Sequence, residues 1–494
     1  TWDESTNEWK VFDNEAYVES VFCWNDVTIG QKAKIFGIVL MDGVGAIREM
    51  VVFDQNGNII LPSNSSEYHE LFDEQEKYHT DTTYFYRTMF DEVYHARTAY
   101  ETLHGLPIYE VSHPPLGKNL MSLGIKAFGM TPFGWRFVVG VFGVLMTPLF
   151  YAFALSIMKK RKYAVATAIL LNLEFSHFTL SRIATIDIIV ALFILLEFYF
   201  MYRFLQYERM YRYEVNGQKD QMAIVQKKEI MYLVLSGISM GCGMATKWTG
   251  VYATIGLAII FFTFMWSGYS EAECRREEFE HLKKLFYICI VSFVVLPIII
   301  YVLSYNPYVR VWNKNVIQCA YENSISMFQY HEKTIFDHPY ASDWYEWPWM
   351  KTPLFDAIYR YSDGTESMVC TFGNPLIWWG GIIALFHHIY LWFIKKDGTS
   401  KFLCICYLTM FVPWIFIKRT VFIYQYFVSA LILVIMLIHS LSRCKKKADL
   451  KLILFLVVAA GLFVLFYPII SGYRIPHTYV QRYCHWLSTW TFMA

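Results

Sequence analysis

The sequence concentrates potential catalytic side chains in a polar stretch directly before its first long apolar run. The stretch begins Phe-Asp-Glu-Val-Tyr-His-Ala-Arg at residues 90–97 and ends Ser-His-Pro-Pro-Leu-Gly-Lys at residues 112–118. Asp91 and Glu92 offer a general base, while the histidines, the arginine and the lysine offer hydrogen-bond donors and cations for a phosphate. These are the groups that a transferase working at a membrane surface needs.

A second interpretation of this stretch involves no chemistry. An apolar stripe runs through it at helical spacing, formed by Val93, Ala96, Tyr100 and Leu103. This pattern is typical of an amphipathic helix whose charged face is simply solvated. The order of features in the rest of the chain is needed to choose between the two interpretations.

The composition indicates a membrane protein. Of the 494 residues, 55% are hydrophobic, 19% are aromatic and only 17% are charged, and soluble domains carry more charge than this. The net charge of +1 and the absence of a basic tract interleaved with aromatic residues give no reason to expect a nucleic-acid partner.

Ten apolar runs are long enough, or nearly so, to cross a bilayer that requires roughly 20 residues. They separate into two groups, residues 133–305 and 374–470, and a short amphipathic piece at 117–128 is expected to lie in the membrane interface. The runs cover residues 133–158, 163–180, 183–203, 230–246, 250–267, 285–305, 374–394, 402–418, 421–441 and 452–470.

The basic loops predict the orientation. Clusters of lysine and arginine fall on every second loop, as at Lys159–Lys162, Lys395-Lys396 and Lys445–Lys447, and cytoplasmic loops carry such an excess. The opposite loops are then extracytoplasmic: residues 1–132 with the catalytic loop at 90–132, the turns at 181–182, 247–249 and 418–419, the long loop 306–373, and the tail 471–494. In this orientation Thr1 lies outside and the number of crossings is even. A protein that starts in the cytoplasm then needs one more crossing before Thr1, and we expect such a helix upstream in the gene.

The N-terminal part has a β pattern. Two-residue alternation over 34–40 and 49–53, followed by the turn Asp54-Gln55-Asn56-Gly57-Asn58 and an apolar 59–61, predicts a hairpin. Residues 1–75 loosely resemble the closing part of a galactose-binding-like β-sandwich, and a small β cap without carbohydrate binding is the alternative. Residues 76–89 are expected to be a linker.

The motifs and their order resemble the protein O-mannosyltransferase family in its bacterial form, over residues 90 to about 470. Single motifs of this kind are weak, whereas eight in one order are specific. They are Phe-Asp-Glu-Val-Tyr (90–94), His-Pro-Pro-Leu-Gly-Lys (113–118), Phe-Gly-Trp-Arg-Phe (133–137), Ser-Arg-Ile-Ala-Thr-Ile-Asp (181–187), Ala-Thr-Lys-Trp-Thr-Gly (245–250), His-Pro-Tyr-Ala-Ser-Asp-Trp-Tyr-Glu-Trp-Pro (338–348), Gly-Asn-Pro (373–375) and Pro-Trp…Lys-Arg-Thr…Tyr-Gln-Tyr (413–426).

The resemblance implies a mainly α, polytopic membrane protein with the fold of the C superfamily of glycosyltransferases. It implies transfer of mannose, with inversion, from a polyprenyl-phosphate carrier to Ser or Thr hydroxyls of exported proteins at the cell membrane. Two departures stand out: the first family helix is missing here, and the 306–373 loop is too short for the β-trefoil domains that fungal and animal members insert. The β segment before Asp91 lies outside the family core.

The resemblance also assigns roles to residues. Asp91 is expected to be the general base, Glu92 to bind or orient donor or acceptor, and Arg136 to hold the donor phosphate with its guanidinium fork. Lys118 and Arg419 lie at outer membrane edges and are further phosphate candidates, although cations there commonly only snorkel.

Supporting roles fall to three further sets of residues. Arg182 and Asp187 lie at the start of a span, where a structural role in holding the turn is expected and Asp187 needs a partner. His113 precedes two prolines and could position its loop or transfer a proton. The aromatic segment with His338, Tyr340, Trp344 and Trp347 could recognise sugar or peptide, or could form an ordinary interfacial belt.

No metal or cofactor is expected, because neither an Asp-x-Asp motif on a cytoplasmic loop nor a P-loop is present and a lipid-linked donor needs none. The predicted partners are the lipid-linked sugar, an exported acceptor protein and membrane lipids, and a second copy forming a dimer is a further candidate. Cys319 and Cys370 could pair if both are extracytoplasmic. The alternatives are a transferase that moves another lipid-linked sugar to a lipid or wall polymer, a lipid-carrier transporter or flippase, and an inactive scaffold.

Overall fold

A computed structural model describes residues 1–3, 6–10, 24–28, 32, 34–37, 47, 49–79, 83–213, 219–271, 275–444 and 447–490. The chain forms two compact units, Thr1–Thr88 and Met89–Ala494. Each unit is described by itself below.

The first unit contains little regular structure among its described residues. Strands β1 (Trp2–Asp3) and β2 (Glu8–Trp9) pair antiparallel, and two 3₁₀ turns, η1 (His69–Leu71) and η2 (Gln75–Lys77), follow. The predicted turn at 54–58 is present: the Asp54 carboxylate accepts hydrogen bonds from the amides of Asn56 and Asn58, both at 2.8 Å.

The hairpin predicted around this turn is much shorter than expected. Its described part is a single antiparallel bridge between Phe53 and Ile59. The predicted strand at 34–40 is described only over 34–37, which is not a strand, and its remainder lies outside the described residues. The likeness to a galactose-binding sandwich stays a prediction.

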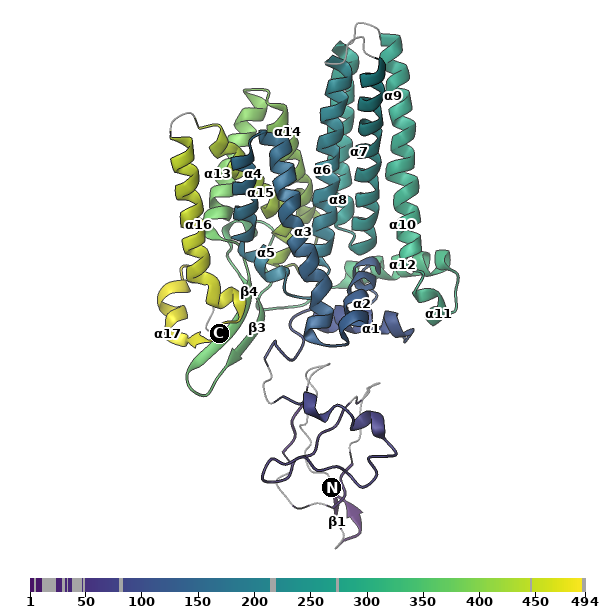
Figure 1. Cartoon of the computed structure of the whole chain (residues 1–494), viewed down its shortest axis with the longest axis vertical. Helices are drawn as coiled ribbons and strands as arrows, with labels where there is room; N and C mark the ends of the chain where they lie inside the picture. The colour runs from purple at the N-terminus through teal and green to yellow at the C-terminus, as the bar shows by residue number, and fades with distance from the viewer. Residues whose placement is uncertain are drawn as a thin grey trace. The chain divides into compact units, whose positions relative to one another are not determined.

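The second unit is a bundle of long helices (Figure 1). Its described part contains nine helices long and apolar enough to cross a membrane, and these correspond to nine of the ten predicted runs. They are built from α3 (Pro132–Met158), α6 (Asp187–Tyr213), α7 (Lys219–Thr246), α8 (Gly250–Glu271), α9 (Arg275–Ile290) continued by the π-helical turn η3 (Val291–Val295) and α10 (Leu296–Ser304), α13 (Pro375–Phe393), α14 (Gly398–Phe411) with η5 (Val412–Phe416), η6 (Ile423–Tyr426) with α15 (Phe427–Ser442), and α16 (Ala448–Ser471).

The tenth predicted run, 163–180, was wrong as a single helix. It is divided into α4 (Arg161–Asn172) and α5 (Phe175–Leu180). The buried Glu174 side chain accepts a hydrogen bond from the amide of His177 at 2.6 Å and one from the indole of Trp378 at 2.9 Å. Since an N-cap acceptor starts a new helix, the chain is interrupted there, and the 12 residues of α4 span only about 18 Å.

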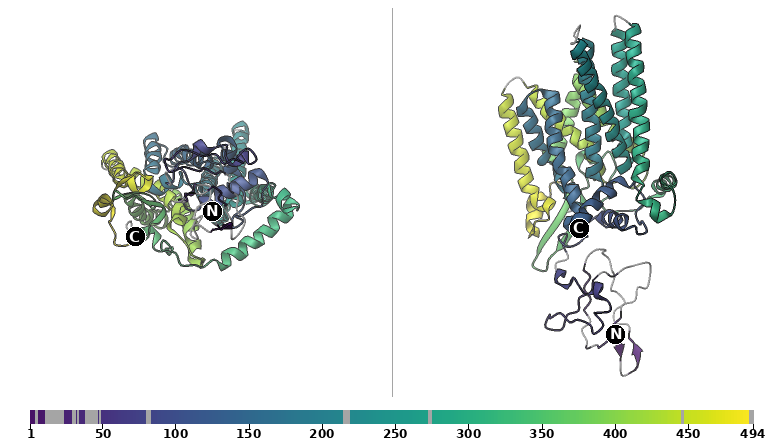
Figure 2. Two further views of the ribbon diagram at one scale, coloured as in Figure 1. Left: turned by 90° about the horizontal axis from the view of Figure 1, so that it is seen from below. Right: turned by 45° about the vertical axis from the view of Figure 1, so that its right-hand side comes forward.

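The shorter elements of this unit gather at the end of the bundle where α3 and α6 begin (Figures 1 and 2). They come from the predicted catalytic loop, from the 306–373 segment and from the C-terminal tail. They are α1 (Glu92–His104), α2 (Leu116–Phe128), α11 (Tyr308–Trp312), α12 (Val316–Lys333), η4 (Trp347–Trp349), β3 (Leu354–Arg360), β4 (Thr365–Thr371), β5 (Ile475–Pro476), α17 (His477–Tyr479) and the π-helical turn η7 (Val480–Cys484).

Strands β3, β4 and β5 form a small antiparallel sheet in that order. The β3–β4 hairpin was not predicted, although Asp363-Gly364 is a usual hairpin signal and Gly364 has the left-handed φ of +78° that such turns require. Cys370 on β4 and Cys319 on α12 are buried free thiols, so the pairing considered for them is absent.

Helix α1 forms where predicted but buries a different face. Its buried residues include Glu92, His95, Ala96 and Ala99, while Tyr100 and Leu103 of the predicted apolar stripe are only half-buried. Polar side chains on the inner face of a helix are costly without partners. This inversion therefore favours a built polar site over a solvated face.

Helix α2 packs very closely on the bundle at Gly117. A Cβ atom at this position would lie 2.7 Å from Cγ2 of Ile186 and 3.0 Å from Cγ2 of Thr246. Ile186 precedes α6 and Thr246 ends α7, so the glycine lets the first turn of α2 lie against the junction of these two helices.

We expect Gly117→Ala to lower the melting temperature in detergent, because the new methyl group overpacks this junction and such substitutions cost about 1–3 kcal/mol. Gly461→Ala is the matched control: it lies in α16, and its added Cβ would meet no atom within 4 Å. This control is expected to be neutral or to stabilise by up to about 1 kcal/mol. Equal melting temperatures for the two variants would contradict the close packing.

Candidate active site

Asp91 stands at the N-cap of α1 and is half-buried. The preceding residue, Phe90, has a left-handed φ of +47°, a conformation that non-glycine residues seldom adopt without support. Among the described residues, the Asp91 carboxylate makes neither a hydrogen bond nor an ion pair. It is therefore available to accept a proton from a bound molecule.

The surroundings of Asp91 favour its protonated form. Burial raises the pKa of Asp91 to about 7, the negative charges of Asp187 and Glu110 add to this rise, and the positive charge of Lys247 opposes it. A carboxyl group whose pKa lies near neutrality suits general base catalysis at physiological pH.

Glu92 is in the opposite situation, because it is fully buried and fully paired. Its carboxylate binds Arg136 through both oxygens, at 2.7 Å each, and also accepts hydrogen bonds from the amides of Met89 at 2.9 Å and Ala184 at 2.7 Å. Two of the residues predicted to meet substrate therefore bind each other. Their pair connects α1 to α3 and to the turn before α6.

Lys118, predicted as a phosphate candidate, is also engaged within the protein. Its ammonium group is fully buried and donates to the Glu110 carboxylate, to the Glu110 carbonyl at 2.9 Å and to the His113 carbonyl at 3.0 Å. Burial opposes the charge of Glu110, but Lys118 and His113 outweigh it and hold the pKa of Glu110 well below its usual value.

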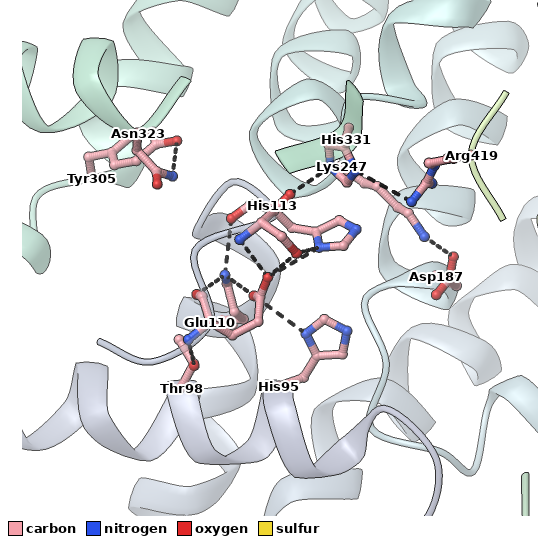
Figure 3. Close-up of polar contacts among 12 residues, drawn as sticks. His95, Thr98, Glu110, His113, Asp187, Lys247, Tyr305, Asn323, His331 and Arg419 are labelled. Carbon is pink, nitrogen blue, oxygen red and sulfur yellow. Dashed lines mark hydrogen bonds and ion pairs between the residues drawn. The ribbon is translucent and has the colours of Figure 1, made fainter. Parts of the chain in front are cut away.

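Three histidines surround this ion pair (Figure 3). His113 Nδ1 lies 3.3 Å from Glu110 Oε1, and the ring of His113 lies 5.9 Å from that of His95 and 5.5 Å from that of His331. Burial lowers the pKa of His95 to about 3 and those of His113 and His331 to about 4. All three rings are therefore neutral at physiological pH.

The predicted partner of Asp187 turns out to be Lys247, which follows α7. Their ion pair measures 2.7 Å, and the Lys247 ammonium lies 5.2 Å from the ring centre of Tyr424. Phe90 packs edge-on against the same ring at 5.8 Å, so Tyr424 connects Lys247 with the residue before Asp91.

Arg419 and Arg182 differ in their surroundings. Arg419 is half-buried, lies 3.4 Å from His331 Nδ1 and lines a surface hollow, so it remains within reach of a ligand. Arg182 instead donates to the carbonyl of Ser471 at 3.1 Å. It thereby ties the turn before α6 to the end of α16, which is the structural role expected for it.

The aromatic segment lies on the hollow that Arg419 lines, which is formed by residues of 335–346 and 418–421. His338 packs on Phe422 at 5.0 Å and on Tyr340 at 5.5 Å. Trp347 is fully buried and donates to the Ser342 carbonyl at 3.0 Å, while Trp344 packs against Phe411 at 5.7 Å. Trp347 is thus a core residue, and His338 borders the hollow directly.

Sequence reasoning assigned no role to several residues that the structure brings to this region. Glu110, Lys247 and His331 come from distant segments, and only Lys247 stood in a recognised motif. Asp356 is a fourth: a register shift in β3 surrounds it, Thr371 donates to it at 2.6 Å, and burial raises its pKa well above the usual value. Asp356 lies on β3, a strand that the sequence pattern did not predict, so no sequence signal marked it as a site residue.

Comparison with known proteins identifies the family. The sequence model described as dolichyl-phosphate-mannose-protein mannosyltransferase matches residues 126–312, and that of the C-terminal four-transmembrane region of protein O-mannosyltransferase matches residues 316–490. The chain belongs to the protein O-mannosyltransferase family. The predicted fold class and the assignment as a glycosyltransferase are thereby confirmed.

Similar proteins agree with this membership. A polyprenol-phosphate-mannose–protein mannosyltransferase of Mycobacterium tuberculosis is 23% identical over 364 residues, covering 66% of this chain and 70% of the relative. That of Mycolicibacterium smegmatis is 22% identical over 456 residues, covering 81% and 87%. The Saccharomyces cerevisiae Pmt1-Pmt2 complex bound to the sugar donor has the same fold, with a TM-score of 0.68, 14% identity and coverage of 82% and 89%.

Because Glu92 and Arg136 form a buried ion pair, removal of one partner is expected to destabilise the protein strongly. Arg136→Met leaves a buried carboxylate uncompensated, so we expect a loss of about 3–5 kcal/mol in the free energy of unfolding. The double variant Glu92→Gln/Arg136→Met should recover part of that loss, because no buried charge remains. Thermal unfolding in detergent measures both.

The control for this comparison is Lys162→Met, which removes a cation from a solvent-exposed pair with Asp449 and should change stability by less than about 1 kcal/mol. If Arg136→Met unfolds like the wild type and weakens only donor binding, Arg136 is a phosphate ligand and not a structural cation.

Proposed function

We propose that this protein transfers mannose from a polyprenyl-phosphate carrier to Ser or Thr hydroxyls of exported proteins. The names of the mycobacterial relatives support the donor and the class of acceptor. The observation that carries the proposal is the half-buried Asp91, which has no hydrogen-bond or ion-pair partner among the described residues and whose pKa is raised to about 7 beside a region that contains Lys247 and Arg419.

In the proposed reaction Asp91 is the general base. The acceptor hydroxyl oxygen attacks the anomeric carbon from the face opposite the phosphate, and its proton passes to an Asp91 carboxylate oxygen. The bond between the anomeric carbon and the phosphate oxygen breaks at the same time, and polyprenyl phosphate leaves with the electron pair. A single displacement of this kind inverts the configuration at the sugar carbon.

The leaving phosphate requires fixed positive charge. Arg419, whose guanidinium can pair with two phosphate oxygens, and Lys247 are the cations best situated for it. Arg136 and Lys118 act indirectly, by pairing with Glu92 and Glu110 and so fixing the loop that carries Asp91. Since protein cations supply the charge at a monophosphate leaving group, the proposed transfer needs no metal ion.

The proposed orientation has the site on the extracytoplasmic side. Helix α1, at whose N-cap Asp91 stands, and the β3–β4 hairpin lie at the end of the bundle where α3 begins, whereas the basic loops Lys159–Lys162 and Lys395-Lys396 follow the other ends of α3 and α13 (Figure 1). The excess of basic residues on cytoplasmic loops supports this orientation. The hollow bordered by His338 and Arg419 is the proposed entry for the acceptor.

Asp91→Asn tests the assignment of the base. We expect transfer of mannose from a polyprenyl-phosphate donor to a Ser/Thr peptide to fall by about 10²–10⁴-fold, with donor binding retained because the amide has the same size and only proton acceptance is lost. Asp449→Asn, an exposed carboxylate at the other end of the bundle, should transfer at the wild-type rate. Full activity in Asp91→Asn would refute the role, and transfer of other sugars but not mannose would refute the donor.

The pH dependence tests the electrostatics of Asp91. A base must be deprotonated to act, so a pKa raised to about 7 means that kcat/KM should fall as the pH drops below about 7. Because the charge of Asp187 contributes to this rise, Asp187→Asn should move the acid limb to lower pH, and Lys247→Met should move it to higher pH. Initial rates at constant ionic strength measure the shifts, and a limb that stays in place in both variants would contradict the assignment.

A further inference from the structure

A second polar cluster lies in the helical bundle, far from Asp91. Glu208 on α6, Glu229 on α7 and His281 on α9 bring ligand atoms to within 4.8 Å of one another. The three helices run side by side at the end of the bundle opposite α1 and α2 (Figure 1). Glu208 lies roughly 30 Å along α6 from Asp187, so the cluster takes no part in the sugar transfer.

Glu229 is the residue in this cluster whose charge is least compensated. Its side chain is 1% exposed, and neither of its carboxylate oxygens has a hydrogen-bond partner in the described part of the chain. His281 Nε2 lies 3.8 Å from Oε1 of Glu229. A buried carboxylate without donors is unfavourable, so Glu229 requires either a proton or a cation.

Glu208 and His281 are arranged around the same point. One oxygen of Glu208 binds Arg212 Nε at 2.6 Å, and its other oxygen lies 3.1 Å from His281 Nε2. Arg212 also pairs with Glu278 at 2.6 Å. The carboxylates of Glu208, Glu229 and Glu278 thus lie close to the Arg212 guanidinium, and Lys284 is a further cation that acts on Glu229.

We propose that Glu208, Glu229 and His281 bind a divalent transition-metal ion of the Zn²⁺ type, which joins α6, α7 and α9. Zn²⁺ takes imidazole nitrogen and carboxylate oxygen together, at about 2.0–2.2 Å, and a water molecule can supply the fourth position. Mg²⁺ and Ca²⁺ prefer ligand sets made only of oxygen. Contraction of the present donor separations around one ion would complete the site.

Zn²⁺ binding to the purified full-length protein tests the proposal. We expect about one Zn²⁺ per chain by elemental analysis after equilibration with ZnCl₂ and removal of free metal, and a higher melting temperature with Zn²⁺ than with a chelator, since a ligand that binds the folded state stabilises it. Glu229→Gln and His281→Gln should each abolish both effects.

The matched control is Glu197→Gln. Glu197 also lies on α6, is fully buried and has two carboxylate oxygens without hydrogen-bond partners among the described residues, but it lies outside the cluster, so this variant should keep the bound Zn²⁺. Wild-type protein that retains no Zn²⁺ and gains no stability from it would overturn the proposal and identify Glu208 and Glu229 as a pair sharing a proton. Zn²⁺ binding that persists in both His281→Gln and Glu229→Gln would also overturn it, since the metal would then lie elsewhere. The wild-type titration is decisive even if a variant does not fold.

Discussion

The buried ion pair between Glu92 and Arg136 is the contact on which the candidate site depends. It joins α1 to α3, and the Ala184 amide extends it to the turn before α6. Because a carboxylate shielded from water is stable only with such partners, displacement of α3 would leave the Glu92 charge without its cation, and displacement of the turn before α6 would remove one of its hydrogen bonds. Because Asp91 immediately precedes Glu92, this pair also fixes where the proposed base stands.

Two adjacent carboxylates thus acquire opposite properties from their surroundings. Glu92 has four donors and is a structural anion, whereas Asp91 is desolvated, has no donor in the described part of the chain and carries a raised pKa. The Lys118–Glu110 pair and the neutral histidines around it form a stiff wall beside Asp91. A positioned carboxyl group whose pKa lies near neutrality is suited to general base catalysis.

The two ends of the helical bundle carry different sets of polar side chains. At one end, Arg136 and Asp187 lie near the beginnings of α3 and α6, and Lys247 follows the end of α7. At the other end, Glu208, Glu229 and His281 join three helices through side chains that the transfer reaction does not use. Apolar helical segments between the two ends keep these polar groups apart.

Length, apolarity and motif order already determined the class of protein, nine of the ten apolar runs that form helices, and the family, and the apolar spacing from Val93 to Leu103 indicated a helix there. These properties depend on local composition and on residues close together in sequence. The break at Glu174, the inward polar face of α1, the β3–β4 hairpin and the partners of Arg136, Lys118 and Asp187 could not be read in this way. Each depends on a contact between segments far apart in the chain, as between Glu92 and Arg136 or Glu174 and Trp378. Only the tertiary structure decides whether a given charge meets a substrate or another side chain, because burial and pairing are properties of the assembled fold.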